Sequence, residues 1–194
     1  MQRSSFMKVE NEEIRCLVLE KAKSMILAKG LKNLNMDELA KECQLAKPTL
    51  YKIIQSKAQL IEKIALHFYE STFAKFYHYY LEYPSLGNLL EGSVQSLEEI
   101  SVGKLRVLVR EIYVEYPYIK GVIEEYLTTL EERFYQLVRQ FQIEGSIAQD
   151  INLRLMIEII RKTLQISIDS NESDEIIKEK IHIFNKLIVR GLKV

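Results

Sequence analysis

Apolar residues recur at intervals of three and four along almost the whole chain, the spacing that places them on one face of an α-helix. One such series begins at Ile14, continues to Ile26 and ends before Gly30. No segment shows the sustained alternation of apolar and polar residues that is typical of β-strands. Only 7 glycines and 3 prolines occur in 194 residues, so breaks between helices are few. The sequence therefore predicts an all-α fold.

Two short helices are predicted within residues 35–54. Asn35 stands three residues before Glu38, an Asn form of the capping box that starts the first of them. Pro48 falls in the first turn of the second, where an amide hydrogen has no partner inside the helix. Ser56 can cap a long helix that follows. The longer helices are expected at about residues 9–29, 56–83, 86–100, 104–116, 118–144, 151–169 and 174–192.

The two short helices, with a tight turn between them, have the size of a helix-turn-helix, whose second helix lies in the major groove of DNA. A step of about 100° per residue divides this second helix into two faces. The inward face carries Ala46, Leu50, Ile53 and Ile54. The outward face offers groups that suit base edges and phosphates. They are Pro48, Tyr51, Lys52 and Gln55, flanked by Lys47 and Thr49.

Charge is unevenly distributed along the chain. The 27 basic and 27 acidic residues balance, but residues 1–60 hold 11 Lys or Arg and 7 Asp or Glu, which leaves 16 and 20 for the remainder. The positive charge therefore lies at the end that carries the predicted helix-turn-helix, where a phosphate backbone would meet it. Spacing and charge alone remain compatible with an ordinary solvated helix face.

The run from Met36 to Leu60, MDELAKECQLAKPTLYKIIQSKAQL, resembles the DNA-binding signature of TetR-family transcriptional regulators. That signature combines an Ile/Leu-Ala helix, a Gly-Val turn, a segment like Ser-Lys-x-Thr-Leu-Tyr, then an aromatic residue, a lysine and a leucine. The matching residues are Leu39-Ala40, Leu45, Lys47, Thr49-Leu50-Tyr51, Lys57 and Leu60.

The resemblance implies a helix-turn-helix DNA-binding domain of three helices at residues 1–55. It implies phosphate contacts from Thr49, Tyr51 and Lys57 and base contacts from Lys47, Pro48, Tyr51 and Lys52. Asn35 would cap the first short helix and face phosphate as well. Lys57 also opens the next helix, so its ammonium and the free amides there could bind one phosphate together.

The chain departs from this signature at three positions, and a further residue, Asp37, bears on DNA binding. Gln44 replaces the turn glycine, so it must accept a positive φ at some steric cost or the turn must differ. Ala46 replaces a capping serine and removes one hydrogen bond. Ile54 replaces an aromatic residue but stays apolar. Asp37 lies near the DNA side, where its carboxylate would repel phosphate.

The same resemblance assigns residues 56–194 to a larger helical domain for effector binding and dimerisation. Gly145-Ser146-Ile147 with Asp150 is similar to the connection before the family's penultimate long helix. The last two helices carry apolar stripes that could form a four-helix bundle with those of a second subunit, or be buried within one subunit. The expected interface residues are Met156, Ile160, Leu164, Ile181, Phe184 and Ile188.

Aromatic residues are frequent in the middle helices. The resemblance implies a pocket for a small-molecule effector among them, and apolar clefts with a few hydroxyl groups are typical ligand sites. Aromatic residues at helical spacing can equally form a simple core. The candidate pocket residues are Phe68, Phe73, Tyr77, Tyr113, Tyr126 and Phe134.

Signals for an enzyme, a metal or a cofactor are absent from the sequence. Cys16 and Cys43 are too few for a disulfide framework or a cysteine-based zinc site, and their spacing indicates small core residues. His67, His78 and His182 form no HExxH motif, and no nucleophile elbow or glycine-rich phosphate loop occurs. No signal peptide or membrane-length apolar run is present, which predicts a cytoplasmic location.

The resulting prediction is a homodimeric, DNA-binding transcription repressor that binds a palindromic double-stranded operator and is released by a small-molecule effector. The alternative is an all-helical interaction module with vestigial DNA binding or none. Strongly salt-dependent DNA affinity would separate the two, because phosphate contacts release counterions.

Overall fold

The structure, a computed structural model, describes residues 2–82, 85–89, 91–92, 95 and 102–192. Within these ranges the regular elements are all helical, which confirms the all-α prediction. The helices are α1 (Gln2–Lys29), the 3₁₀ turn η1 (Leu31–Asn33), α2 (Met36–Glu42), α3 (Lys47–Ile54), α4 (Lys57–Glu82), α6 (Lys104–Glu115), α7 (Tyr118–Ile143), α8 (Leu153–Asp169) and α9 (Asp174–Leu192).

The predicted helix at 86–100 can be checked only in part. Residues 86–89, 91–92 and 95 are helical, and the rest of that segment lies outside the described residues. Among the described helices, none combines the length and the apolar character that crossing a lipid bilayer requires.

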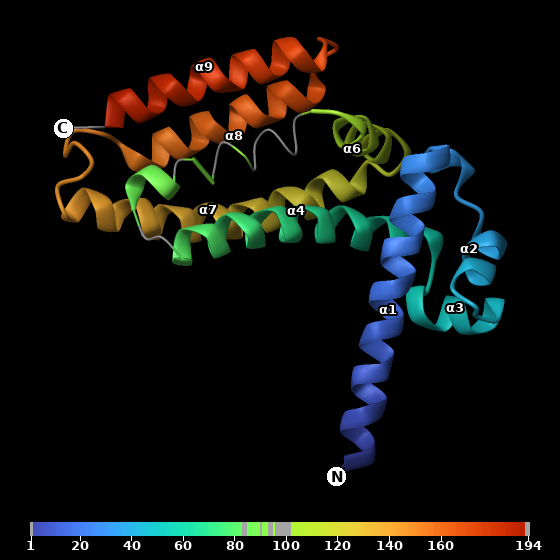
Figure 1. Ribbon diagram of the computed structural model, residues 1–194. Helices are drawn as coiled ribbons and strands as arrows, with labels where there is room; N and C mark the ends of the chain where they lie inside the picture. The colour runs from blue at the N-terminus through green and yellow to red at the C-terminus, as the bar shows by residue number, and fades with distance from the viewer. Residues whose placement is uncertain (1, 83–84, 90, 93–94, 96–101, 193–194) are drawn as a thin grey trace.

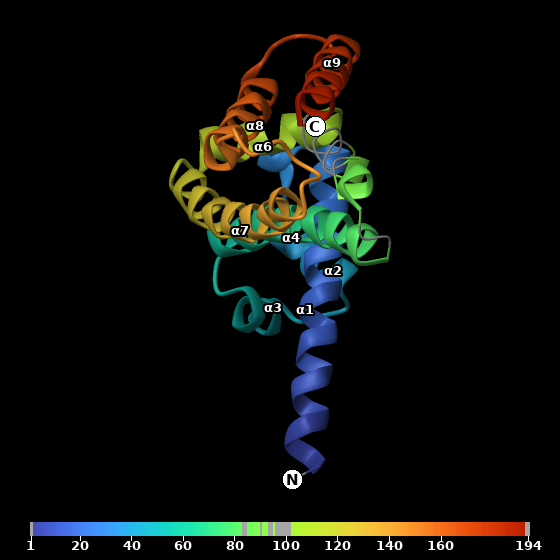
Figure 2. The same ribbon diagram turned by 90° about the vertical axis from the view of Figure 1, so that its left-hand side faces the viewer.

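The helices form two groups at opposite ends of the molecule (Figure 1). At one end, α2 and α3 lie beside α1, whose N-terminal half extends past α3. At the other end, α7 lies against α4 and α8, and α9 forms the outermost layer (Figures 1 and 2). Helix α6 crosses between the groups and contacts α1, η1, α7 and α8. The molecule therefore has a helix-turn-helix end, a long-helix end and one short helix that contacts both.

The main hydrophobic core runs through the junction of the two groups. It joins Leu39 of α2, Leu50 of α3 and Leu60 of α4 to Ile112 of α6 and Ile123 of α7, all of which are at most 1% exposed. Burying one such aliphatic side chain contributes about 1.5–3 kcal/mol relative to leaving it in water. The helix-turn-helix is thus packed on the rest of the protein by continuous apolar contact. A second cluster of buried apolar side chains is formed largely by α7, α8 and α9 and includes Val138, Leu153 and Leu192.

Three local signals in the sequence have the expected structural result. The Asn35 side chain accepts hydrogen bonds from the backbone amides of Asp37 at 2.8 Å and Glu38 at 3.3 Å. The Ser56 hydroxyl accepts one from the amide of Gln59 at 3.1 Å, which confirms the cap of α4. Ala46 precedes α3 without a side-chain cap bond, as its replacement of serine predicts. The boundaries of these helices follow from local side-chain chemistry.

Two residues expected on inward faces are exposed. Ala46 is exposed because it lies before the first turn of α3, outside the helical repeat used to predict its direction. Cys16 is exposed as well, so its interpretation as a core residue is wrong, whereas Cys43 is buried as predicted. Burial is the largest cause raising the pKa of the Cys43 thiol.

Candidate nucleic-acid interface

Helix α3 is attached to the protein by one face only. Leu50 is fully buried and Ile54 is 2% exposed, and both belong to the main core. Ile53, the third inward residue, is partly buried and packs against the same cluster. Because the helix has only 8 residues, these side chains fix which residues point outward.

The opposite face of α3 is open to solvent. The candidate DNA-contacting residues of this helix, namely Lys47, Pro48, Thr49, Tyr51 and Lys52, are all exposed. The helix lies at an outer edge of the molecule, on the side away from α9 (Figures 1 and 2). The geometry therefore leaves room for a second macromolecule along the length of α3.

The turn between α2 and α3 has the hydrogen bonds of a Schellman motif. The amide of Leu45 donates to the carbonyl of Ala40 at 2.8 Å, and the amide of Gln44 donates to that of Lys41 at 3.0 Å. Gln44 has φ 55°, so it takes the first of the two alternatives that the sequence left open, the left-handed conformation. Gln55 also has a positive φ, 65°, at the end of α3. The helical spacing predicted Gln55 as part of the helix and did not indicate this conformation.

Carboxylates of α2 bind three lysines. Asp37 Oδ1 lies 2.6 Å from the Nζ atom of Lys47, and this contact raises the pKa of Lys47. Glu38 binds Lys29, instead of returning to the Asn35 amide as a complete capping box requires. Glu42 lies 3.6 Å from Lys21. Part of the positive charge predicted for this end of the molecule is therefore neutralised within it.

Two further lysines differ in their surroundings. Lys57 is partly buried, and its Nζ donates to the carbonyl of Leu34 at 2.8 Å. An ammonium has three donors, so two remain for another acceptor. Lys52 is exposed and has no ion pair among the described residues. Of the α3 cations, Lys52 is open to solvent and Lys47 is held by Asp37.

A short helix with an exposed polar face, held by buried leucine and isoleucine behind a fixed turn, is the arrangement of a helix-turn-helix. Residues 18–64 match the family described as "Bacterial regulatory proteins, tetR family". Over 149 residues the chain is 29% identical to the HTH-type transcriptional regulator UidR of Escherichia coli strain K12, and the match covers 75% of each protein. Residues 18–64 carry a DNA-binding domain of the TetR family.

Solved structures agree on the fold of the chain. Salmonella enterica GusR is similar with a TM-score of 0.68 and 21% identity, over 93% of this chain and 95% of that one. A TetR-family transcriptional regulator from Pectobacterium atrosepticum is similar with a TM-score of 0.72 and 16% identity, over 96% and 97%. Transcription regulation through a DNA-binding helix-turn-helix follows from the family.

The residues expected at a dimer interface lie mostly toward the interior of the single subunit. Met156 is 6% and Ile181 is 2% exposed. Ile160, Phe184 and Ile188 are partly buried, and the side chain of Leu164 lies outside the described part of the structure. The burial of Met156 and Ile181 corresponds to the second option that the sequence left open, packing within one subunit.

A different set of apolar side chains on α8 and α9 is exposed. Their exposed fractions range from 45% to 69%. The set consists of Leu155, Ile159 and Ile166 on α8 and Ile176, Ile183 and Leu187 on α9. A groove of about 750 Å³ between α8 and α9 is bordered by Ile166 and Lys180. In the sequence, Lys180 stands between the exposed Ile176 and Ile183. Sequence analysis missed this second stripe, although the spacing of its residues is helical.

The candidate effector-pocket residues do not form one cluster. Phe68, Tyr113 and Tyr126 belong to or pack against the main core, Phe134 packs against the second core, and Tyr77 is 38% exposed. The side chain of Phe73 lies outside the described part of the structure. The hollow beside Phe68 measures about 10 Å³, room for no more than one water molecule. The pocket stays a prediction.

A pair of tyrosines lies in this core, formed by the candidate pocket residue Tyr113 and by Tyr69, which was not predicted. The hydroxyl oxygens of Tyr69 on α4 and Tyr113 on α6 are 3.2 Å apart. Burial raises the pKa of Tyr69 well above its usual value and also raises that of Tyr113. Both hydroxyls are therefore neutral at pH 7 and can donate or accept one further hydrogen bond.

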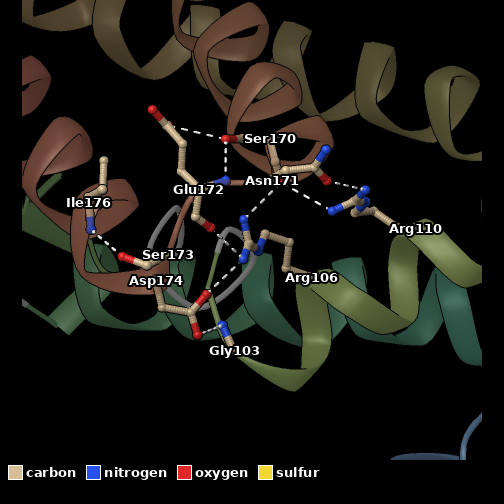
Figure 3. Close-up of polar contacts among 9 residues, drawn as sticks. All are labelled: Gly103, Arg106, Arg110, Ser170, Asn171, Glu172, Ser173, Asp174 and Ile176. Carbon is tan, nitrogen blue, oxygen red and sulfur yellow. Dashed lines mark hydrogen bonds and ion pairs between the residues drawn. The ribbon is translucent and has the colours of Figure 1, made fainter.

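The N-terminal half of α6 binds the connection between α8 and α9 (Figure 3). Arg106, 8% exposed, donates to the carbonyls of Ser170 at 3.0 Å and Glu172 at 3.1 Å and pairs with Asp174 at 3.0 Å. Arg110 donates to the same Ser170 carbonyl at 3.1 Å. The α6 helix is thus held to this connection by charged hydrogen bonds, which are about twice as strong as neutral ones.

The other half of α6 binds the helix-turn-helix end. Glu111 accepts a hydrogen bond from the amide of Leu31 in η1 at 3.3 Å. Glu115 lies 3.0 Å from the Nζ of Lys32. These contacts, together with the buried Ile112, connect α6 directly to the segment that precedes α2.

Proposed function

We propose that this TetR-family regulator is a repressor that binds a palindromic operator as a homodimer and is released by a small-molecule effector. The observation that carries the proposal is the α3 helix, which has Leu50 and Ile54 buried and five candidate DNA-contacting residues exposed. A repressor of this kind acts in the cytoplasm, where the operator lies.

The residues of α3 are assigned to bases or to phosphates by their position on the helix and by their chemistry. Residues at the N-terminus of a recognition helix approach base edges, which assigns Lys47 and Pro48 to bases. The hydroxyls of Thr49 and Tyr51 suit phosphate oxygens, and so does the remaining donor capacity of Lys57. Lys52 approaches bases or phosphate from the open face. We place the DNA-binding domain at residues 1–55 and the larger domain at residues 56–194, so that α4 is the first helix of the larger domain.

The proposed dimer uses the exposed apolar stripes of α8 and α9. Helix-turn-helix proteins read two half-sites about 34–36 Å apart, so a palindromic operator needs two α3 helices in a fixed relation. A two-fold axis brings the same surface of both subunits together. Leu155, Ile159 and Leu187 are about half exposed or more in the single subunit, so pairing them removes apolar surface from water. Met156 and Ile181 would support these helices from inside.

The proposed effector is an apolar molecule with a hydrogen-bonding group that reaches the Tyr69 and Tyr113 hydroxyls. Tyr113 lies on α6, the helix that binds the α8–α9 connection through Arg106 and η1 through Glu111. An effector that favours a second position of α6 would shift both contacts. It would then stabilise a dimer whose α3 helices no longer match successive major grooves.

A salt titration of DNA binding tests the function. The purified protein is titrated against a fluorescent duplex that carries the upstream region of its own gene, at salt concentrations from about 50 to 200 mM. We expect tight binding that weakens with salt, and weaker binding by Tyr51→Ala and Lys52→Ala. Lys120→Ala, which removes an exposed lysine from α7, is the matched control. Equal binding by wild type and all three variants would contradict the assignment of α3 to DNA.

A further inference from the structure

The contact between Asp37 and Lys47 joins the two helices of the helix-turn-helix on their exposed side. Asp37 lies in the first turn of α2, where Asn35 binds its backbone amide at 2.8 Å. Lys47 is the first residue of α3. Their side chains are about half exposed, 60% and 54%, and meet at 2.6 Å. The backbone on both sides of the contact is fixed, so the pair occupies a defined place beside the N-terminus of the recognition helix.

A carboxylate at this place changes what the lysine contributes to DNA binding. Affinity for DNA of any sequence comes from lysines and arginines that neutralise phosphates and release counterions. Lys47 already has a counter-charge within the protein, and Asp37 repels phosphates that come near it. The pair therefore adds little net positive charge when the protein meets a phosphate backbone alone.

A base edge can use the same lysine without displacing the carboxylate. The ammonium has three donors, and one donor bound to Asp37 leaves two. Guanine presents two acceptors, N7 and O6, in the major groove, where a lysine can reach them. Asp37 can also accept from the amino group of a cytosine. An operator with such a base at the right position benefits from the pair, and other DNA does not.

We propose that Asp37 is a specificity-determining residue, which holds Lys47 for base contact and withholds it from phosphate. The proposal rests on the proposed function, because it needs α3 to enter the major groove. It explains why a carboxylate is tolerated on the DNA side of this chain. It also predicts that removing the charge of Asp37 strengthens binding to random DNA.

The other two carboxylates of α2 provide matched controls. Glu42 pairs with Lys21 at 3.6 Å and Glu38 binds Lys29, and both of these lysines lie on α1. Replacing Glu42 by glutamine changes the net charge of α2 as much as Asp37→Asn does, but leaves Lys47 and its partner intact. An effect of net charge alone would appear in both variants.

The test compares wild type, Asp37→Asn and Glu42→Gln on two duplexes of about 30 base pairs. One duplex has a random sequence, and the other is selected from a randomised pool by the wild-type protein. Between about 50 and 200 mM salt, we expect Asp37→Asn to steepen the salt dependence on the random duplex by about 0.9 in the log-log slope. Its affinity for that duplex should rise, and this gain over wild type should shrink about threefold between 50 and 200 mM salt, the loss expected of one phosphate contact. Affinity for the selected duplex should rise less, so the specificity ratio falls.

A second background separates an effect through Lys47 from one of general charge. In Lys47→Ala, the added Asp37→Asn substitution should leave the slope on the random duplex unchanged. The same increase in that background, or in Glu42→Gln, would overturn the proposal. Equal slopes and ratios for wild type and Asp37→Asn would overturn it too, while leaving the DNA-binding function supported. Absence of salt-dependent binding by wild type to either duplex would overturn both.

Discussion

The outer face of α3 and the outer faces of α8 and α9 expose opposite kinds of chemistry. Helix α3 presents lysines, a hydroxyl, a phenol and a proline, and keeps Leu50 and Ile54 buried. Helices α8 and α9 are buried along one stripe and still expose six large aliphatic side chains along another. Polar groups on a short, rigid helix suit a charged, hydrated partner such as DNA, whereas aliphatic stripes suit a partner that covers them.

Helices α3 and α8 also differ in how they are held in the protein. The 8 residues of α3 depend on two buried side chains and on a turn of defined geometry. The 17 residues of α8 pack along their length, and the connection that follows is bound by Arg106 and Arg110. A single substitution should therefore have very different effects at the two surfaces.

The largest effect is expected from Leu50→Ala, which removes the main support of α3. Leu50 is fully buried, and truncating a buried leucine to alanine lowers the free energy of unfolding by about 2–5 kcal/mol. Tyr51→Ala, one residue further on the exposed side, should change it by no more than about 0.5 kcal/mol. Urea unfolding followed by circular dichroism measures both. Similar losses in the two variants would mean that α3 is not held by one face.

The second largest effect is expected at the other surface, from the double substitution Ile159→Glu and Leu187→Glu. Both side chains are exposed in the single subunit, so the helical content should be retained. In a dimer they would bury unpaired carboxylates, which is strongly unfavourable. We expect the dimer dissociation constant to rise at least about 100-fold, or about 2.7 kcal/mol.

Sedimentation velocity over a range of protein concentrations measures this change. Lys120→Glu, on the exposed side of α7, introduces a carboxylate outside the two stripes and is the control. An unchanged dimer in the double variant would show that α8 and α9 pair through other residues or not at all.

The third prediction concerns Asp174→Asn, which weakens the contact between α6 and the α8–α9 connection. The substitution leaves the Arg106 guanidinium, 8% exposed, without its counter-charge. It also places an amide donor against one of the two groups that donate to Asp174, Arg106 at 3.0 Å or the Gly103 amide at 2.9 Å. Because Asp174 is itself partly exposed, water screens part of the loss, and we expect about 1–2 kcal/mol less stability. Operator affinity should change in the same variant, because α6 contacts η1. Lys180→Met, which removes the exposed ion pair with Glu172, is the comparison at the same connection.

The two surfaces also differ in how far they could be predicted from sequence. Some roles follow from local spacing, because the residue affects only backbone within a few positions of itself. These residues are Asn35, Ser56, Pro48 and Gln44. The bonds of Lys57 to Leu34 and of Lys47 to Asp37 join residues in different elements and depend on the turn. Their lysines were predicted as DNA contacts, but their partners within the protein were not.

The α8 and α9 helices show the limit of periodicity more clearly. Met156 and Ile160 belong to one helical stripe and Leu155 and Ile159 to the next, one residue apart. Both stripes have the spacing of an apolar helix face, and only the packing of α7 and α9 decides which one is covered. The Tyr69–Tyr113 contact is also a product of packing, since it joins residues 44 positions apart.

The smallest effect is expected from Gln44→Gly in the turn that sets the position of α3. Gln44 has φ 55°, a conformation that glycine adopts without the steric penalty of a side chain. Glycine is also the usual residue at this place in a Schellman motif. Relief of this strain is offset by the greater freedom of glycine in the unfolded chain, so we expect a net stabilisation of about 0.5–1 kcal/mol. Thermal unfolding measures the difference, with Gln136→Gly in the interior of α7 as a control that should destabilise. If Gln44→Gly destabilises as well, the glutamine side chain contributes more to the turn than its backbone strain removes.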